Sequence, residues 1–338
     1  MYLCCGIFCY NKCMSKIRVG VLRGGPSSKY EESIDTGSNI LRNLSNDIYI
    51  PSDIFISRSG VWHTRGFEVS PYKALKNVDV VFNALHGEYG EDGKVQKELD
   101  AFQVPYTGSR AMSSAIAMNK AQAKKIVAGA GIKTPLHVVV EQTSDVEDVA
   151  TKIFRTFPQP VIIKPLNGGS SVGVLFAGSY RELVDSLNFA FRRYPVVLIE
   201  EFIKGKEVTS GVVDNFRGED KYTLLPIEIN LSNGRIFFDY ESKCLLDSNH
   251  VGINCPGCLS VEEKSKIKEV TQKVHEVLGL RHYSRSDFIV TPQGVYFLEA
   301  NTLPSLSEKS LVSYALEEAG CSFKEFVDHI IGLAVNGK

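Results

Sequence analysis

The sequence predicts an α/β fold with an open sheet at its N-terminal end and an α+β arrangement in its C-terminal part. Residues 17–22 form a short apolar run that ends in a glycine-containing turn at residues 24–28, and a helical stretch follows. This order of strand, turn and helix is typical of an open α/β sheet. Near the other end, two β-branched and aromatic runs flank Pro292, Gln293 and Gly294 and predict a β-hairpin.

The remaining elements follow from apolar periodicity and from the positions of proline and glycine. We expect strands at residues 17–22, 48–56, 78–85, 136–140, 161–165, 172–177 and 196–199, and helices at 31–44, 111–129, 146–156, 261–278, 309–319 and from 323 onward. Residues 239–259 are polar and lack periodicity, which predicts a long functional loop. We divide the chain into residues 1–13, 14–109, 110–203 and 204–338.

The composition is that of an ordinary soluble protein. The 338 residues are 43% hydrophobic and 23% charged, and the length allows two or three domains. Lys and Arg number 38 against 39 Asp and Glu, so the bulk charge indicates neither nucleic acid nor an anionic membrane as a partner. No apolar run approaches the roughly 20 residues that a membrane-spanning helix needs.

The cysteines indicate a reducing compartment. None of the eight lies between Met14 and Cys244, so we expect a cytoplasmic protein without a disulfide framework. Residues 1–13 lack the features of a signal peptide, and we interpret them as an over-called start or a loose tail, with a metal or lipid anchor as the alternative. Cys255 and Cys258 form a CxxC pair, but they lack the strand-to-helix setting of a redox dithiol, and one such pair cannot complete a zinc site.

The register of the C-terminal hairpin decides which side chains share a face. A three-residue loop at residues 292–294 would pair Thr291 with Val295. Counting back in twos then places Asp287 opposite Glu299. A two-residue loop would separate these two carboxylates.

The same register places Arg285 opposite Asn301, on the face of the two carboxylates. Facing carboxylates repel each other unless a cation lies between them, and an amide oxygen adds a third hard ligand, so Asp287, Glu299 and Asn301 predict a magnesium site. The alternative is a surface hairpin whose polar face is merely solvated. The opposite face should be apolar and consist of Phe288, Val290, Tyr296 and Leu298.

Loops at strand ends are further candidates. His86 lies in a glycine-rich loop where a ligand could bind, and the alternative is a tight loop with a satisfied histidine. Lys164 ends a strand before the glycine loop at residues 167–173, which either folds over phosphates or is an ordinary hairpin turn. Glu207 follows the strand at residues 196–199, where backbone groups could meet an adenine edge. The lack of GxGxxG and GK[ST] argues against a dinucleotide site and a Walker A loop.

Together these pieces resemble the D-alanine–D-alanine ligases of the ATP-grasp superfamily. The resemblance runs from about Ile17 to Leu333 and is carried by LRGGPSS, NALHGEYGEDG, PYTGS, VIIKPLNGGSSVG, VLIEEFIKGKEV, DYESK, RSDF and FLEANTLPS, in that order. It implies an N-terminal substrate-binding domain at residues 14–109, a central ATP-grasp subdomain at 110–203 and a C-terminal ATP-grasp subdomain at 204–338. ATP would lie between the last two, and the protein would be a homodimer.

The resemblance also implies a role for each site residue. Lys120 and Lys164 would hold the ATP phosphates, Glu200, Glu201, Phe202 and Ile203 the adenine, and Glu207 the ribose. Asp287, Glu299 and Asn301 would bind two magnesium ions, or manganese in their place. Ser170 would belong to a lid over the phosphates, and Lys243 would reach them from the long loop. His86, Ser310 and Leu311 match positions that receive the second substrate's carboxylate, and Arg285 would stabilise an oxyanion.

The implied reaction joins two D-alanine molecules for peptidoglycan precursors. ATP converts a carboxylate into an acyl phosphate, with magnesium and lysines neutralising the charge on the γ-phosphoryl group, and an amine then attacks. Arg285 and backbone N–H groups would stabilise the tetrahedral oxyanion, a contribution worth roughly 3 kcal/mol per donor at comparable sites.

Three positions depart from the family pattern. Lys29 stands in line with a glutamate that meets the first substrate's ammonium in relatives, where a lysine would be repulsive. Cys244 aligns with a tyrosine of the long loop, and a cysteine neither reaches nor donates like a phenol. Ser305 replaces a glycine after the metal ligands. Glu31 or Glu32 is our candidate to restore the missing carboxylate.

These departures leave two alternatives to a D-alanine–D-alanine ligase. One is a related ligase with a different donor or acceptor, such as a D-hydroxy acid. The other is an ATP-binding paralogue that no longer turns over and acts as a sensor or partner protein. None of the three implies a nucleic-acid or membrane partner.

Overall fold

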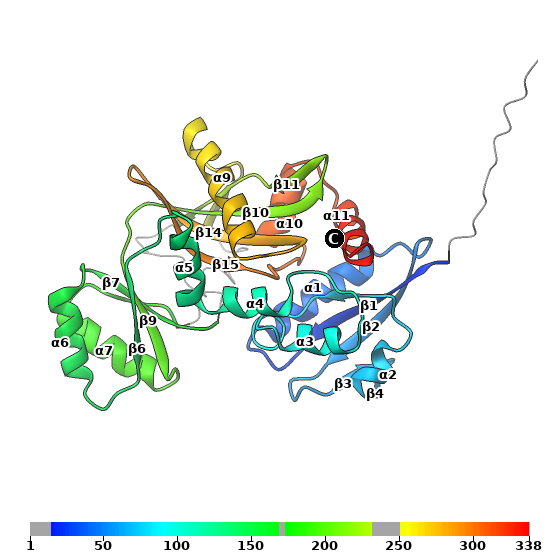
Figure 1. Ribbon diagram of the computed structural model, residues 1–338, viewed down its shortest axis with the longest axis horizontal. Helices are drawn as coiled ribbons and strands as arrows, with labels where there is room; N and C mark the ends of the chain where they lie inside the picture. Colours follow the sequence, from blue (N-terminus) through cyan, green and yellow to red (C-terminus); the bar gives the residue numbers. More distant parts are fainter. Residues whose placement is uncertain (1–14, 169–172, 232–250, 338) are drawn as a thin grey trace, which may run out of the picture.

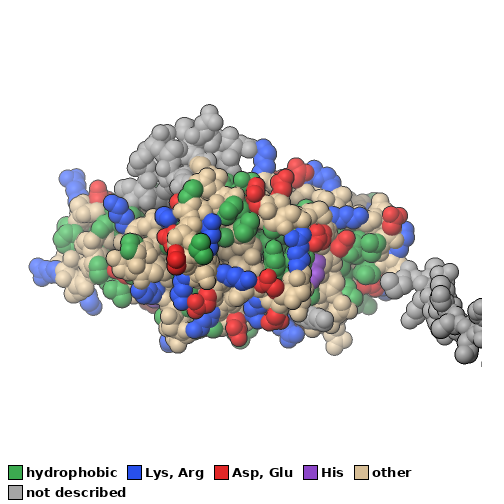
Figure 2. Space-filling view, turned by 90° about the horizontal axis from the view of Figure 1, so that it is seen from above, with side chains coloured by type: hydrophobic (Ala, Val, Ile, Leu, Met, Phe, Trp, Pro, Cys, Tyr) green, Lys and Arg blue, Asp and Glu red, His purple; other side chains and the backbone are tan. Residues whose placement is uncertain are grey.

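The computed structural model describes residues 15–168, 173–231 and 251–337, and these residues form three β-sheets with packed helices (Figure 1). The mixture of sheets and helices confirms the expected α/β character. Among the described residues on the face shown in Figure 2, basic and acidic side chains are interspersed rather than gathered by sign. No helix within the described ranges has the length and apolar character needed to cross a membrane.

The first sheet contains β1 (Ile17–Gly24), β2 (Tyr49–Ile56), β3 (Trp62–Thr64), β4 (Phe67–Glu68) and β5 (Val80–Asn83), in the order β4-β3-β2-β1-β5. The helices of this part are α1 (Tyr30–Asn43), α2 (Pro71–Leu75) and α3 (Lys94–Ala101). β1 is parallel to both β2 and β5, as expected of an open α/β sheet. Adjacent residues of β1 point to opposite faces of the sheet and enter two different apolar clusters, Val21 one and Leu22 the other. Both faces of the sheet are therefore covered.

The turn after β1 requires glycine and determines where α1 begins. Gly24 has a φ of +91°, and a side chain at this position would lie 2.2 Å from the carbonyl oxygen of Ile56. Five residues further on, Lys29 is the N-cap residue of α1, but its side chain makes no capping hydrogen bond. The side chain of Lys29 is therefore free to reach into the site described below.

The second sheet is antiparallel and contains β6 (His137–Glu141), β7 (Val161–Pro165), β8 (Leu175–Ala177) and β9 (Val196–Glu201), in the order β6-β9-β7-β8. Helices α6 (Val146–Thr156) and α7 (Tyr180–Phe191) share one apolar cluster with this sheet and lie side by side in Figure 1. The side chains of Asp145 and Ser179 cap them by accepting backbone N–H groups. Helix α7 was not expected from the residue pattern.

The third sheet contains β10 (Lys206–Phe216), β11 (Glu219–Thr223), β12 (Ile227–Leu231), β13 (Val251–Asn254), β14 (Tyr283–Thr291) and β15 (Gly294–Asn301). Its order is β13-β12-β10-β14-β15, with β11 paired to β10. Helix α9 (Val261–Val277) packs on it in an apolar cluster that includes Phe288 and Phe297. All pairings within this sheet are antiparallel, which agrees with the α+β expectation for this part of the chain.

The helix expected at residues 111–129 is two helices, α4 (Ala111–Met118) and α5 (Lys120–Gly129). Asn119 leaves the helical conformation between them, and its side chain caps α5 by accepting the N–H of Gln122. Both helices share the apolar cluster of the third sheet, although the chain runs on from α5 into the second. Residues at the start of α5 consequently stand between these two sheets.

The last two helices return to the first sheet. α10 (Leu311–Glu318) and α11 (Phe323–Val335) share an apolar cluster with β1, β5 and α1. The loop after β15 is tied to α1, because the side chain of Asn39 on that helix donates to the carbonyl oxygen of Leu306 at 2.8 Å. The division at residues 14–109, 110–203 and 204–338 stays a prediction, and the apolar cores cross its boundaries.

Candidate active site

The hairpin of β14 and β15 brings its two carboxylates together by a route that differs from the prediction. Thr291 pairs with Gly294, so the expected three-residue loop is wrong and the turn has two residues. A regular ladder from this turn would put the acids on opposite faces. A β-bulge between Asp287 and Phe288 shifts the register, and Asp287 pairs with Glu299 as predicted.

The bulge also changes which residues are buried. Leu298 is the extra residue, because Phe288 pairs with Phe297 and Asp287 with Glu299. The assignment of Tyr296 and Leu298 to the apolar face is wrong, since both are only half-buried. The fully buried face consists of Phe288, Val290, Val295 and Phe297.

The polar face carries paired charges. The Nε and Nη2 atoms of Arg285 lie 3.0 and 3.2 Å from the two carboxylate oxygens of Asp287. The amide of Asn301 donates to Asp287 at 3.4 Å, and the ammonium of Lys120 lies 3.3 Å from Glu299. Burial lowers the pKa of Arg285, but the attraction of Asp287, and then of Glu299, outweighs it and raises that pKa. Arg285 therefore stays charged.

The donors on this face fit a divalent cation. Asp287 and Asn301 are 7% and 8% exposed, and with Glu299 they offer two carboxylates and one amide oxygen, all hard ligands, from neighbouring strands. Across residues 15–168, 173–231 and 251–337, no three His, Cys, Asp or Glu side chains form a group that could hold a metal ion by themselves. The mixed set of Asp287, Glu299 and Asn301 stays a prediction.

Two of the expected lysines lie beside this face. Lys120 opens α5, and its ammonium donates to the carbonyl oxygen of Gly168, at the start of the glycine loop. Lys164 is the last residue but one of β7, and its ammonium lies 2.6 Å from the carboxylate of Glu200. Burial would lower the pKa of Lys164, but Glu200, then Glu299 and Glu207, raise it. The ammonium of Lys164 therefore lies within electrostatic reach of acids from both sheets.

A third lysine, which was not among the expected site residues, completes this group. Lys124 is fully buried, and its ammonium lies 2.9 Å from the second oxygen of Glu200. It also donates to the carbonyl oxygen of Phe297 at 3.2 Å. Burial lowers the pKa of Lys124 to about 8 despite the attraction of Glu200. Its position one helical turn after Lys120 was the available signal, because residues four apart share a helix face.

The chain from Glu200 to Glu207 leaves the second sheet and enters the third. The carboxylate of Glu200 is already shared by two lysines, and that of Glu201 accepts the N–H of Leu136 at 2.9 Å. The ring of Phe202 stacks edge-on against Phe176, with 5.5 Å between centroids. Backbone groups of this crossing, including Ile203, are thus the remaining candidates to meet an adenine.

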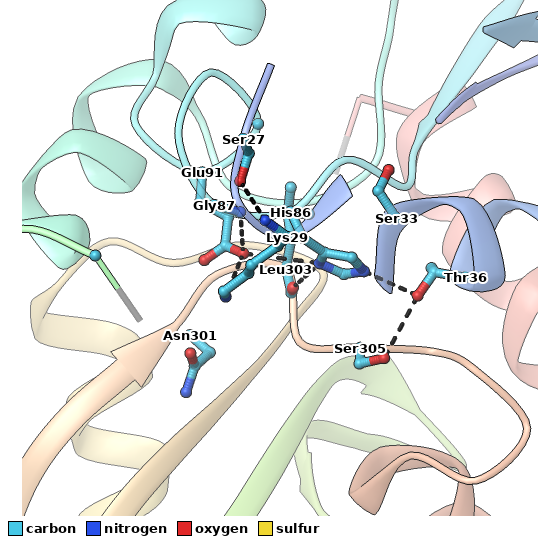
Figure 3. A network of polar contacts seen from close by, with 12 residues as sticks. Ser27, Lys29, Ser33, Thr36, His86, Gly87, Glu91, Asn301, Leu303 and Ser305 are labelled. Atoms are coloured by element: carbon cyan, nitrogen blue, oxygen red, sulfur yellow. Dashed lines mark hydrogen bonds and ion pairs between the residues drawn. The ribbon is translucent and has the colours of Figure 1, made fainter. Parts of the chain in front are cut away.

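His86 lies at the centre of a second network (Figure 3). Its Nδ1 lies 2.9 Å from the carbonyl oxygen of Leu303, which can only accept, so we assign the proton to Nδ1. Its Nε2 lies 2.8 Å from the hydroxyl of Thr36, which also accepts the N–H of Leu306 at 3.2 Å. Both ring nitrogens of His86 have protein partners, and the side chain is 1% exposed. This geometry matches the satisfied histidine that was the alternative to a ligand-binding one.

Lys29 and Glu91 complete this network, and Glu91 was not predicted. The ammonium of Lys29 lies 3.2 Å from Glu91, whose carboxylate also accepts the N–H of Gly87 at 2.8 Å and lies 3.7 Å from Nδ1 of His86. Gly87 must be glycine, because its φ is +70° and a side chain would meet the hydroxyl of Ser27 at 2.2 Å. Burial raises the pKa of Glu91, but Lys29 and His86 lower it to about 2. Its position in the same loop as His86 was the available signal.

The two carboxylates proposed to replace the missing glutamate point in different directions. Glu31 is exposed and pairs with Arg58 at 2.6 Å, so the structure does not bring it to the network. Glu32 is half-buried. Burial would lower the pKa of Lys29, but Glu91, and then Glu32, raise it. Glu32 therefore lies within electrostatic reach of Lys29, whereas Glu31 forms its ion pair at the protein surface.

Ser310 and Leu311 lie at the N-terminus of α10. The hydroxyl of Ser310 caps this helix by accepting the N–H of Ser313 at 3.2 Å, and a helix N-terminus attracts anions. Leu311 and Arg285 line the same small cavity, so an anion at this helix would lie near the guanidinium. Ser305 faces α1, with its hydroxyl 3.5 Å from that of Thr36.

Some expected residues lie outside the described part of the chain. These are Ser170, Lys243 and Cys244. Cys255 and Cys258 are described, and both are free thiols.

Comparison with known proteins places this geometry in one family. Models of the D-ala D-ala ligase N-terminus and C-terminus match residues 65–109 and 126–332. The D-alanine–D-alanine ligase of Geobacter sulfurreducens is 36% identical over 319 residues, which cover 93% of this chain and 93% of that protein. The ligase of Fervidobacterium nodosum is 35% identical over 321 residues, covering 93% of this chain and 97% of that protein.

Comparison with solved structures leads to the same family. The VanG D-Ala:D-Ser ligase of Enterococcus faecalis matches with a TM-score of 0.79 at 29% identity, covering 95% of this chain and 100% of that one. The D-alanine–D-alanine ligase of Bacillus anthracis complexed with ATP matches with a TM-score of 0.77 at 28% identity, covering 96% and 98%. The chain therefore belongs to the D-alanine–D-alanine ligase family of ATP-dependent ligases with the ATP-grasp fold.

Proposed function

We propose that this protein joins two D-alanine molecules through an acyl phosphate, using ATP, to make peptidoglycan precursors in the cytoplasm. The observation that carries the proposal is the ion pair of Lys120 with Glu299 on the carboxylate hairpin of β14 and β15, with Lys164 within electrostatic reach of the same carboxylate. Lysines are the usual phosphate ligands and carboxylates the usual magnesium ligands of phosphoryl-transfer sites. Their combination in one place suits transfer of the ATP γ-phosphoryl group to a carboxylate.

The charges are arranged for such a transfer. Lys120 and Lys164 would bind the triphosphate where Lys120 already holds the start of the glycine loop. Asp287, Glu299 and Asn301 would hold two magnesium ions, which when bound supply positive charge at the γ-phosphoryl group. The crossing at residues 200–203 would hold the adenine through its backbone, and Glu207 the ribose.

Arg285 would serve the second step. When the amine of the second substrate attacks the acyl phosphate, negative charge gathers on the carbonyl oxygen before phosphate leaves. Asp287 holds the guanidinium of Arg285 through two hydrogen bonds, so that it is oriented in advance. The N-terminus of α10, with Ser310 and Leu311, would hold the carboxylate of the second substrate near this group.

A related ligase with a different substrate is the second candidate. Lys29 puts a buried cation where the resemblance implies an anion for a substrate ammonium. The VanG ligase, whose name specifies D-Ala and D-Ser, has a TM-score of 0.79 with this chain. By analogy with the family we also propose a homodimer, and magnesium rather than manganese as the metal.

The test is phosphate release from Mg-ATP with a panel of D-amino and D-hydroxy acids, supplied singly and in pairs. Turnover with D-alanine alone, together with formation of the dipeptide, supports the first candidate. Turnover only with another pair supports the second. If the protein binds ATP but releases no phosphate with any member of the panel, only the ATP-binding paralogue without turnover remains.

A further inference from the structure

One buried cation has no part in the proposed chemistry. The side chain of Lys124 is fully buried, and none of the roles proposed above is assigned to it. Its ammonium takes one oxygen of Glu200 at 2.9 Å, while Lys164 takes the other at 2.6 Å. Glu200 itself is 2% exposed, so water does not screen this triad.

The charge count of the triad explains why two lysines share one acid. A single carboxylate offsets one ammonium, so the three groups together carry one net positive charge. Burial would raise the pKa of Glu200, but Lys124, and then Lys164, lower it, so the carboxylate stays ionised. Without Lys124, the Glu200 carboxylate would be offset by Lys164 alone, and no net charge would remain.

We infer that Lys124 is a positioning residue for Lys164: by holding one oxygen of Glu200, it leaves the Lys164 ammonium with net positive charge to offer the ATP triphosphate. This inference rests on the proposed ATP-dependent function. Lys164 is the least buried member of the triad, at 12% exposed against 0% for Lys124 and 2% for Glu200, so it is the member that a phosphate would meet first.

Lys124 also connects the two sheets that would enclose the nucleotide. Glu200 lies near the end of β9 in the second sheet. The Phe297 carbonyl that accepts from Lys124 lies on β15 of the third sheet, two residues before Glu299. Lys120, one turn earlier on α5, pairs with Glu299 itself. One face of α5 thus sets the position of the phosphate-binding lysine and of the metal-ligand strand relative to each other.

The test compares Lys124→Met with Lys125→Met, an exposed lysine at the next position of the same helix. We expect Lys124→Met to raise the KM for ATP by at least about tenfold, and to change the KM for D-alanine by less than about twofold. Lys125→Met should leave both values unchanged. An unchanged KM for ATP in a folded Lys124→Met protein would overturn the inference, and so would an equal rise in both KM values.

A second arm separates positioning from simple stabilisation. In a Glu200→Gln background there is no carboxylate to share, so Lys124→Met should change the KM for ATP by less than about twofold. The same tenfold loss in both backgrounds would show that Lys124 acts independently of Glu200 and would contradict the inference. If Lys124→Met does not fold, Lys124→Gln, which keeps a donor for the Phe297 carbonyl, carries the same comparison.

Direct titration with Mg-ADP keeps the two proposals apart. A wild-type protein that binds Mg-ADP but shows no turnover contradicts the proposed function alone, and the loss of affinity in Lys124→Met still tests the inference. If the wild-type protein is active and Lys124→Met binds Mg-ADP with the same Kd as wild type, the result contradicts the inference alone. A wild-type protein that binds no nucleotide contradicts both.

Discussion

Lys29 and Glu91 form an ion pair of 3.2 Å in which the side chains are only 9% and 7% exposed. The pair joins the turn before α1 to the loop that carries His86, and it fills the position where the family resemblance implies an anion for the first substrate. Breaking one partner of a buried pair leaves an uncompensated charge, whereas removing both does not.

We therefore expect Lys29→Met to lower the free energy of unfolding by about 3 kcal/mol, as is typical for a broken buried pair. The double variant Lys29→Met/Glu91→Gln should recover most of that loss, because no buried charge remains. Urea unfolding measures both, with Lys97→Met, an exposed lysine on α3, as the control. If the single and the double variant lose the same free energy of unfolding, the unpaired Glu91 carboxylate is not the cause of the loss.

Acid should weaken the protein partly through Glu91. Its pKa is lowered to about 2 from 4.5, so its carboxylate stabilises the fold above pH 4.5, and that contribution is lost as the pH falls from 4.5 toward 2. Between pH 6 and pH 3, wild type should lose about 2 kcal/mol more of its unfolding free energy than Glu91→Gln does. Urea unfolding at both pH values measures the difference. If wild type and Glu91→Gln lose the same free energy of unfolding between these pH values, Glu91 is not the cause.

The metal ligands should reveal themselves through magnesium dependence. Asp287→Asn and Glu299→Gln each remove one charged ligand, and we expect the magnesium concentration for half-maximal activity to rise at least about tenfold. Asp220→Asn is the matched control, since Asp220 lies exposed on β11 of the same sheet. If activity depends on magnesium concentration in the same way in wild type and in all three variants, these carboxylates do not hold the metal.

Arg285 should matter for the rate more than for binding. Arg285→Met removes the charge that would stabilise the oxyanion, and we expect kcat to fall by about 10² to 10³ with less than about threefold change in the KM for D-alanine. Steady-state kinetics measures the split, with the exposed Arg193→Met as the control. A rise in KM at unchanged kcat would instead assign Arg285 to ground-state binding.

The local pattern of the chain was sufficient for most elements. The parallel strands of the first sheet, the helices α1, α6 and α9, and the β14–β15 hairpin lie close to where periodicity and turn residues place them. The pairing of Asp287 with Glu299 was also predicted, but from a three-residue loop, whereas the structure reaches it through a two-residue turn and a bulge at Leu298. A bulge depends on which faces are buried by distant helices, and a strand's own residues do not record it.

The sequence by itself determined the order of the elements, the family motifs and the acids, amide and lysines available for chemistry, because these follow from residue type and short spacing. Apart from the pairing of Asp287 with Glu299, only the tertiary structure decided their partners. It turned Glu31 outward, paired Glu91 with Lys29, satisfied both nitrogens of His86 and placed Lys124 against Glu200. Each of these outcomes depends on contacts between segments that lie far apart in the chain, where burial and the loss of water set which charges can remain ionised.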